Sequence, residues 1–313
     1  MTEAVDIGVV QYPRVQEAAI LGLADMFDIA NARPSCPGRL VTSRWNLDDN
    51  GSLVPQEMRE SHKPPAVLLI PPAKGPPISA ETARPYKQAL SGFHGAGGVV
   101  SSVCGGSFLL AEAGLLDQRT ATTHFAFQEE FTRRFPKVKL AIDRLIVDDG
   151  DIITAGGLMA WTDLGLKLVG RYLGPSVMLE TARILVVDPP GREQSYYGTF
   201  VPWTNHGDAG ILGVQHWIHA AFAKNLTNKA FADKAALGER TFLRRFNKAT
   251  GMNPTDYLQH VRINKAREIL QFSPTSIDQV AWQVGYSEPS AFRKVFHRIV
   301  GLTPNEYRRR FHV

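Results

Sequence analysis

The chain has 313 residues and a net charge of +5, and 44% of its residues are hydrophobic. This length is about twice the ~150 residues of a typical domain, which predicts two domains, each with its own core. Two cysteines, Cys36 and Cys104, are too few for a disulfide scaffold. No apolar run reaches the ~18 residues of a membrane span, and the first residues lack a secretory signal, so we expect a protein of the reducing cytoplasm.

The charge is divided unevenly along the chain. Residues 210–313 contain 16 Lys and Arg against 7 Asp and Glu, whereas residues 1–209 contain 19 against 23. Cations clustered at one end are typical of a polyanion-binding domain joined to an acidic partner domain. A solvated basic surface without a ligand explains the same charge.

In the first half, apolar stretches of strand length alternate with amphipathic stretches of helix length. The strand patterns fall at 5–10, 39–45, 66–70 and 98–103, and the helical patterns at 15–31, 79–92, 107–113 and 157–174. The last helix is predicted to bury Leu158, Trp161, Leu164, Leu168 and Tyr172. Asp149-Gly150 predicts a tight turn between two further strands. This alternation predicts an α/β domain with a doubly wound, mostly parallel sheet.

The two halves are separated by a segment rich in Gly, Pro and polar residues, without helical or strand periodicity. We therefore expect a first domain at 1–190, a linker at 191–210 and a second domain at 211–313. Strand patterns are missing after the linker, so the second domain is predicted to be all-helical.

The second domain contains an internal repeat. Residues match at an offset of 50: Phe242 with Phe292, Phe246 with Phe296, Gly251 with Gly301, Pro254 with Pro304, and Tyr257 with Tyr307. Each copy predicts a helix-turn-helix. In the second copy, Ser276 and Gln279 form a capping-box pattern, Gly285 allows the sharp turn, and the next helix starts at Ser287.

The second helix of each copy has one aromatic face and one polar face. The outward residues are Arg240, Thr241, Arg244 and Lys248 in the first copy, and Ser290, Arg293, Lys294 and His297 in the second. Side chains of these types bind bases and phosphates when a helix enters a major groove. We predict that these eight residues bind double-stranded DNA, and that a connecting helix near 254–272 holds both helices about 34 Å apart. The alternative is that they only keep the helices soluble.

Cys104 lies at a predicted strand-to-helix elbow. Residues 99–103 form the strand, Gly105-Gly106 the turn and residues 107–113 the helix. A helix N-terminus at the carboxyl end of a strand offers free N–H groups, which suit a small anionic or amide-bearing ligand.

These motifs resemble two known families. Residues 211–311, with ERTFLRRFNKATGMNPTDY and VGYSEPSAFRKVFHRIVGLTPNEY, resemble the DNA-binding domain of the AraC/XylS regulators. The first half, with SVCGGSFLLAEAGLLDQRTATTHF, resembles the amidotransferase-like PfpI superfamily, and the combination resembles the GlxA-type AraC regulators. The resemblance implies a flavodoxin-like first domain, seven helices with two helix-turn-helix units in the second, operator DNA as partner and a homodimer. IPPAKGPP stands where such domains usually have a Gly-Gly turn.

The resemblance also bears on catalysis. Enzymes of this superfamily place a His after the cysteine and a Glu on an early helix, where this chain has Gly105 and, by our alignment, Asp25. His124 is the nearby alternative base, although a bond to a loop backbone is the favoured role, because nothing in the sequence directs His124 at the sulfur. We therefore predict a vestigial elbow without catalysis or cofactor. Its ligand site is predicted to comprise Cys104, Gly105, Gly106, Asp25 and His124.

Three histidines, His206, His216 and His219, lack a completing carboxylate or Cys, so no metal site is expected. Together these features predict a sequence-specific transcriptional regulator that responds to an unidentified small metabolite, in the cytoplasm at the nucleoid. One alternative is a cysteine-dependent amidase or hydratase whose basic domain localises it on DNA. Another is a nucleoid-type DNA binder without sequence preference.

Overall fold

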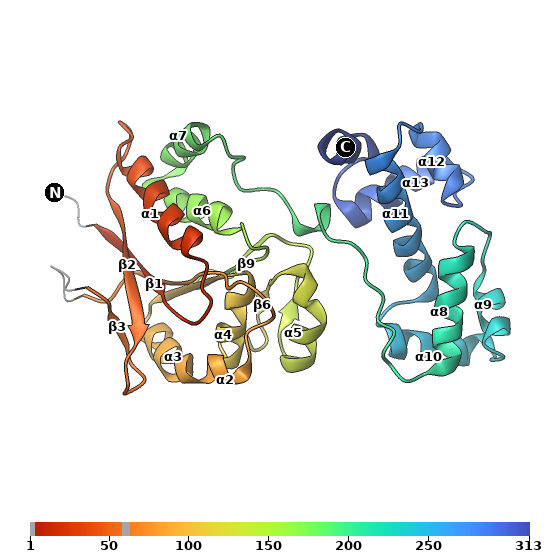
Figure 1. The fold of residues 1–313 in the computed structure, drawn as a ribbon, viewed down its shortest axis with the longest axis horizontal. Helices are drawn as coiled ribbons and strands as arrows, with labels where there is room; N and C mark the ends of the chain where they lie inside the picture. Colours follow the sequence, from red (N-terminus) through yellow and green to blue (C-terminus); the bar gives the residue numbers. More distant parts are fainter. Residues whose placement is uncertain (1–3, 58–62) are drawn as a thin grey trace. The chain divides into compact units, whose positions relative to one another are not determined.

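The computed structural model describes residues 4–57 and 63–313. The chain folds into two compact units, Met1–Gln194 (unit 1) and Ser195–Val313 (unit 2). Figure 1 shows an α/β unit followed by a helical unit, as the sequence predicts. Among the described residues, no helix is both long and apolar enough to cross a membrane.

Unit 1 is built on a seven-stranded sheet with the order β3-β2-β1-β4-β5-β9-β8. The strands are β1 (Val5–Val10), β2 (Leu40–Leu47), β3 (Leu53–Pro55), β4 (Val67–Ile70), β5 (Val99–Val103), β8 (Ile146–Asp148) and β9 (Ile152–Ala155). The five central strands are parallel, and β3 and β8 pair antiparallel at the two edges. The central strands are apolar because helices cover both of their faces.

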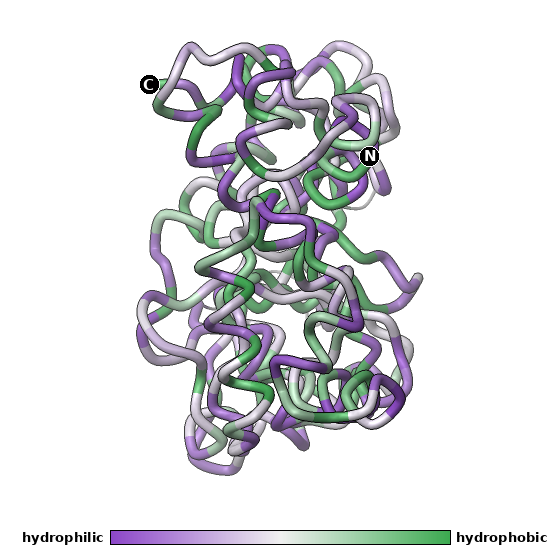
Figure 2. The backbone as a smooth tube through the Cα atoms, turned by 90° about the vertical axis from the view of Figure 1, so that its right-hand side faces the viewer, coloured by the Kyte–Doolittle hydropathy of each residue, from purple (hydrophilic) through white to green (hydrophobic). Residues whose placement is uncertain are grey.

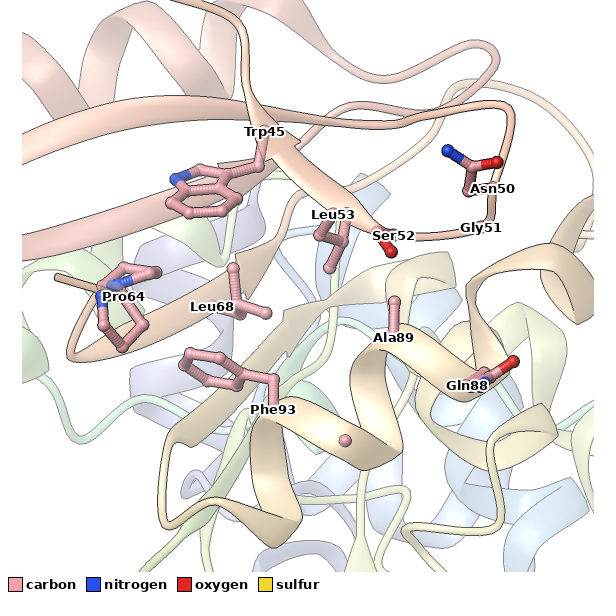
Figure 3. Close-up of a pocket in the computed structure, with 12 residues that line it drawn as sticks. Trp45, Asn50, Gly51, Ser52, Leu53, Pro64, Leu68, Gln88, Ala89 and Phe93 are labelled. Atoms are coloured by element: carbon pink, nitrogen blue, oxygen red, sulfur yellow. The ribbon is translucent and has the colours of Figure 1, made fainter. Parts of the chain in front are cut away.

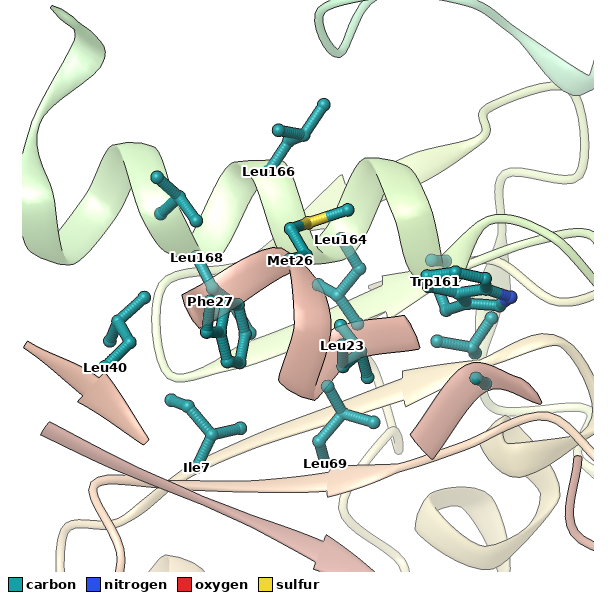
Figure 4. Close-up of a cluster of buried hydrophobic side chains, with 14 of the residues drawn as sticks. Ile7, Leu23, Met26, Phe27, Leu40, Leu69, Trp161, Leu164, Leu166 and Leu168 are labelled. Carbon is teal, nitrogen blue, oxygen red and sulfur yellow. The ribbon is translucent and has the colours of Figure 1, made fainter. Parts of the chain in front are cut away.

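Two layers of helices cover this sheet (Figure 1). One layer holds α1 (Glu17–Asn31), α6 (Trp161–Leu173) and α7 (Pro175–Leu185), and the other α2 (Ala80–Ala83), α3 (Lys87–Gly95), α4 (Ser107–Glu112) and α5 (Gln128–Arg134). Figure 4 shows the first core, where Leu23 and Met26 of α1 pack against Leu164 of α6. Gly165 permits this packing, since a Cβ there would lie 2.6 Å from the Met26 sulfur.

Several elements of unit 1 differ from the sequence prediction. The helix expected from 157 starts at Trp161, and Leu158 is exposed rather than buried, because Gly157 has a φ of +80° and precedes the helix. The short strands β6 (Thr120–Ala121) and β7 (Lys139–Leu140) pair with each other. They were not predicted, because two residues cannot display a period.

Unit 2 contains seven helices in the part of the chain that the structure describes. They are α8 (Ala209–Ala221), α9 (Asn228–Lys234), α10 (Glu239–Thr250), α11 (Pro254–Phe272), α12 (Ile277–Gln283), α13 (Pro289–Val300) and α14 (Pro304–Phe311). Residues from α8, α9, α10 and the first half of α11 form one core, and residues from the second half of α11 with α12, α13 and α14 form another. Figure 2 shows hydrophobic and hydrophilic residues alternating along these helices, as amphipathic packing requires.

The two helix-turn-helix units are α9–α10 and α12–α13. The predicted capping box of Ser276 and Gln279 is present, and Gly285 has a φ of +88° in the turn. The helix after this turn starts at Pro289 with Glu288 as its N-cap, slightly later than predicted. In the first helix-turn-helix, Ala236 adopts the same left-handed conformation in the turn between α9 and α10, with a φ of +52°.

Ala236 therefore offers a stability test. A left-handed conformation costs an L-residue roughly 1–2 kcal/mol, and glycine avoids this cost. Glycine also raises the conformational entropy of the unfolded chain, which offsets part of the gain in stability. We expect Ala236→Gly to raise the free energy of unfolding by about 0.5–1 kcal/mol in urea titrations. Ala235→Gly is the control, because Ala235 has a φ of −85° and glycine there should bring no gain. Equal effects of both substitutions would contradict this explanation.

The predicted linker at 191–210 is divided between the two units. Gln194 is buried in unit 1, and the residues that follow pack on the helices of unit 2. The boundary between the compact units lies at Gln194–Ser195, inside the segment that composition marks as a linker.

Candidate DNA-binding surface and candidate ligand site

The helices α10 and α13 have one fully buried aromatic face each. Phe242 and Phe246 of α10, and Phe292 and Phe296 of α13, are all 0% exposed. Their ring centroids are 5.4 Å apart in α10 and 5.6 Å apart in α13, so the repeated phenylalanines make the same contact twice. This packing directs the opposite face of each helix to solvent.

All eight residues predicted to bind DNA are exposed. They are Arg240, Thr241, Arg244 and Lys248 on α10, and Ser290, Arg293, Lys294 and His297 on α13. Within the described residues, Arg240, Arg244, Lys248 and Lys294 take part in no ion pair. Cations without an intramolecular partner are free to bind phosphates or guanine edges.

Three arginines of these helices, Arg245, Arg293 and Arg298, bond to side chains of unit 2. The Arg245 guanidinium forms a forked ion pair with Asp208, 2.9 and 2.7 Å from its two oxygens, and holds the pKa of Asp208 below its ordinary value. Arg293 pairs with Asp278 of α12, and Arg298 bonds to Gln259 of α11. Arg245 and Arg298 therefore fix helices, whereas Arg293 must leave Asp278 before it can contact a base.

The helix α11 joins the two cores. Its 19 residues span about 28 Å. The Tyr257 hydroxyl lies 3.2 Å from the Gln215 side-chain nitrogen and 2.9 Å from His219 Nε2, which ties α11 to α8. His206 bonds to Gln215 in turn, so two of the three histidines considered for a metal site make structural hydrogen bonds.

Cys104 occupies the elbow that the sequence predicts. It follows β5 and precedes α4, has a φ of +56° and is 2% exposed. A positive φ in a residue other than glycine is strained and is found preferentially at functional sites. Gly106 is required here, because a Cβ would lie 2.8 Å from the Ile70 carbonyl oxygen.

The environment of Cys104 does not activate the thiol. Burial raises the pKa of Cys104 to about 11, and the Gly105 N–H offsets this only in part. Nucleophilic cysteines at helix N-termini have a lowered pKa instead. The thiol is therefore protonated at neutral pH.

His124 does not act on Cys104 in this structure. Its Nδ1 accepts a hydrogen bond from the Ala126 N–H at 3.1 Å, and its ring stacks on Phe125 at 4.4 Å. The preceding residue makes the contact with the elbow, because the Thr123 hydroxyl donates to the Cys104 carbonyl at 2.9 Å. Thr123 was missed in the sequence, where a buried threonine has no distinguishing pattern.

The two further predicted ligand residues, Gly105 and Asp25, have different surroundings. A Cβ on Gly105 would lie 3.6 Å from Phe127 and 3.8 Å from Ile78, so this glycine lies against apolar side chains. Asp25 is exposed on α1, on the side opposite Leu23, which faces the sheet. In contrast to the prediction, the structure does not bring Asp25 to the elbow.

The pocket of unit 1 shown in Figure 3 lies away from the elbow. It has a volume of about 420 Å³ and lies between β2, β3, β4 and α3. Trp45, Leu53, Leu68 and Phe93 form apolar walls, and Gln88 supplies an amide. None of the five predicted ligand residues lines this pocket.

The raised pKa of Cys104 predicts a dependence of stability on pH. The unfolded chain loses the thiol proton near its ordinary pKa of 9.0 and the folded chain only near 11. The free energy of unfolding should therefore fall between pH 9 and pH 11, by up to about 1.4 kcal/mol per pH unit from this group. In urea titrations across this range, Cys104→Ala should lose stability less steeply than the wild type. Parallel pH profiles would contradict a buried, neutral thiol.

Comparison with known proteins agrees with this architecture. The helix-turn-helix domain family matches residues 231–310, and the DJ-1/PfpI family matches residues 57–171. The HTH-type transcriptional regulator GlxA of Rhizobium meliloti is 30% identical over 219 residues, which cover 67% of this chain and 65% of that protein. The HTH-type transcriptional regulator ArgR of Pseudomonas aeruginosa is 30% identical over 230 residues, which cover 70% and 67%.

Among solved structures, a putative transcriptional regulator protein from Vibrio parahaemolyticus covers 58% of this chain and 100% of its own, with 20% identity and a TM-score of 0.49. The chain spans about two thirds of the length of the two curated relatives. Both relatives carry the name of transcriptional regulators, and each matched family range falls within one of the two folded units. The chain belongs to the AraC-type transcriptional regulators whose first domain is of the DJ-1/PfpI family.

Proposed function

We propose that the chain is a sequence-specific transcriptional regulator, which binds operator DNA through α10 and α13 and a small-molecule effector through unit 1. The observation that carries the proposal is the duplicated surface of unit 2. Two helices of the same repeat bury paired phenylalanines and expose the eight polar residues described above. A duplicated recognition helix is suited to two successive major grooves of one duplex.

The effector site is proposed at the elbow, around Cys104, Gly105, Gly106 and the segment 122–125. The hydrogen bond from Thr123 to the Cys104 carbonyl places this segment against the elbow. A protonated, buried thiol contributes an apolar contact rather than a nucleophile. We propose no catalytic activity and no cofactor for this unit.

The regulator is further proposed to work as a homodimer in the cytoplasm at the nucleoid. A dimer brings two copies of unit 2 to one operator, and palindromic operators mirror such two-fold symmetry. Sedimentation of the full chain with and without DNA tests the stoichiometry, with two chains per duplex expected and a single chain contradicting the dimer.

The proposed function is tested by selecting duplexes from a random library with the full chain. Specific regulators bind their sites about 10³ to 10⁷ times more tightly than other DNA. We expect the selected duplex to bind at least 10³-fold more tightly than a scrambled one in fluorescence anisotropy. Equal affinity for both duplexes would identify a binder without sequence preference.

The enzymatic alternative makes a different prediction. If Cys104 were a nucleophile, iodoacetamide would label it rapidly at neutral pH, and the label would abolish turnover of amides. We expect slow labelling at pH 7 that accelerates toward pH 11, since the thiolate is the reactive form. Rapid labelling at pH 7 together with amide turnover would favour the enzyme.

A further inference from the structure

Gln194, the last residue of unit 1, is a buried polar side chain in the segment expected to be a linker. It is 2% exposed. Its amide nitrogen lies 3.0 Å from the Thr122 hydroxyl and 2.8 Å from the Thr123 carbonyl, and its amide oxygen accepts from the Phe125 N–H at 3.2 Å. The same nitrogen lies 3.0 Å from the carbonyls of residues 142 and 144. The side chain thus joins two loops beside the elbow.

The backbone around Gln194 is shaped for this insertion. A Cβ on Gly156 would lie 2.0 Å from the Gln194 amide nitrogen, so only glycine leaves room for it. The two preceding residues are bound as well: Arg192 donates to the buried Asp163 at 2.9 Å, and the Glu193 carboxylate accepts from the Leu145 N–H at 3.1 Å. Three consecutive side chains therefore anchor this segment in unit 1.

The next residue is anchored in unit 2. The Ser195 carbonyl accepts from Arg267 of α11 at 2.6 Å, and Arg267 is 4% exposed. The Tyr196 ring packs on Gly301, the residue that ends α13, where a Cβ would lie 2.7 Å from the ring.

The segment then continues along α11. The Phe200 backbone forms a pair of hydrogen bonds with the Asn264 side chain, at 3.0 and 2.7 Å. The Trp203 carbonyl accepts from Gln215 of α8 at 2.8 Å. Residues 195–203 therefore contact α8 and α11, and α11 joins the two helix-turn-helix cores.

A continuous set of bonds results. The Thr123 hydroxyl donates to the Cys104 carbonyl, and the Gln194 amide donates to the Thr123 carbonyl. A single peptide bond joins Gln194 to Ser195, whose carbonyl accepts from Arg267 of α11. The anchor in unit 1 and the anchor in unit 2 are therefore consecutive residues of the chain. A displacement of Gln194 acts directly on the residue that α11 holds.

We propose that Gln194 is the positioning residue that couples the elbow to the DNA-binding unit, so that a ligand that moves the segment 122–125 alters how α11 holds α10 and α13. This inference rests on the proposed function, since it names how the same site regulates DNA binding. Coupling is reciprocal: DNA bound to unit 2 must then change the segment 122–125. The effector need not be known for the test.

The test follows amide hydrogen exchange of the full chain by mass spectrometry, in peptides covering residues 122–127, with and without the duplex selected from the random library. The Phe125 N–H is a direct reporter, because it donates to Gln194. We expect bound duplex to change the exchange rate of this peptide at least threefold in the wild type and in the control Gln128→Ala. Gln128 is an exposed glutamine of the adjacent helix α5.

Gln194→Ala is expected to abolish this change while still binding the duplex with the affinity of Gln128→Ala. Gln194→Met keeps the length of the side chain without its amide and serves if the alanine variant does not fold. A DNA-dependent change that persists in the folded Gln194 variant, or one that is missing in the wild type while the duplex binds, overturns the coupling alone. If no duplex is enriched in the selection, the proposed function fails, and the coupling fails with it.

Discussion

Replacing Phe292 with alanine is expected to destabilise unit 2 by about 3–5 kcal/mol, the usual cost of emptying a buried aromatic site. Phe292 is 0% exposed and packs against Phe296 and Tyr286, with centroids 5.6 Å away in both cases. The ring fixes α13 on α11, so its loss should also weaken DNA binding. Urea titration of the full chain, followed by circular dichroism, measures the destabilisation.

The control is Phe272→Ala, at the end of α11. Phe272 is 73% exposed, so its truncation should change the free energy of unfolding by less than about 0.5 kcal/mol. A loss below about 1 kcal/mol for Phe292→Ala would mean that the repeated phenylalanines do not hold the recognition helices.

The second large effect concerns DNA affinity. Arg244→Ala on α10 and Lys294→Ala on α13 each remove an exposed cation that has no ion pair within the described residues. Removing a cation that contacts a base should weaken the binding free energy by about 1–3 kcal/mol. Removing a cation that contacts a phosphate should reduce the salt slope of binding by about one. The two residues lie on different helices, so the losses of the double variant should add.

Anisotropy titrations on the selected duplex at several salt concentrations separate these two roles. Lys87→Ala is the matched control, an exposed lysine of unit 1 that should leave both affinity and salt slope unchanged. If both Arg244→Ala and Lys294→Ala bound like the wild type, α10 and α13 would not be the DNA-binding helices.

Arg293 adds a competition within unit 2. It forms an ion pair with Asp278, and both side chains are about half exposed. Exposed pairs contribute little to stability, so DNA phosphate can displace the carboxylate at small cost. The sequence pattern placed Arg293 on the outer face of its helix, but a pattern of one helix could not show a partner on the preceding helix.

The sequence predicted the parts of the molecule that rest on local repetition. Alternating strand and helix patterns gave the parallel sheet, and the offset of 50 between Phe242 and Phe292 gave the two helix-turn-helix units. The strand-to-helix elbow at Cys104 was also predictable, since a cysteine followed by two glycines after an apolar strand is a local signal. Positive φ at Cys104 agrees with that geometry.

Features that depend on distant residues were not predictable. Asp25 was assigned by its place on an early helix, but the side of a helix that faces a site depends on packing, and Asp25 faces outward. The raised pKa of Cys104 comes from burial by several elements and has no sequence pattern. Gln194 looked like one polar residue in a linker, because its five partners lie 50 to 72 positions away.

The central claim is that α10 and α13 read one duplex together, and hydroxyl-radical footprinting of the full chain on the selected duplex tests it most directly. The account predicts that each bound chain protects two segments about one helical turn apart on the same face of the DNA. Arg244→Ala should weaken one segment and Lys294→Ala the other. A single protected segment, or one that both substitutions weaken equally, would contradict the claim that the repeated helices bind side by side.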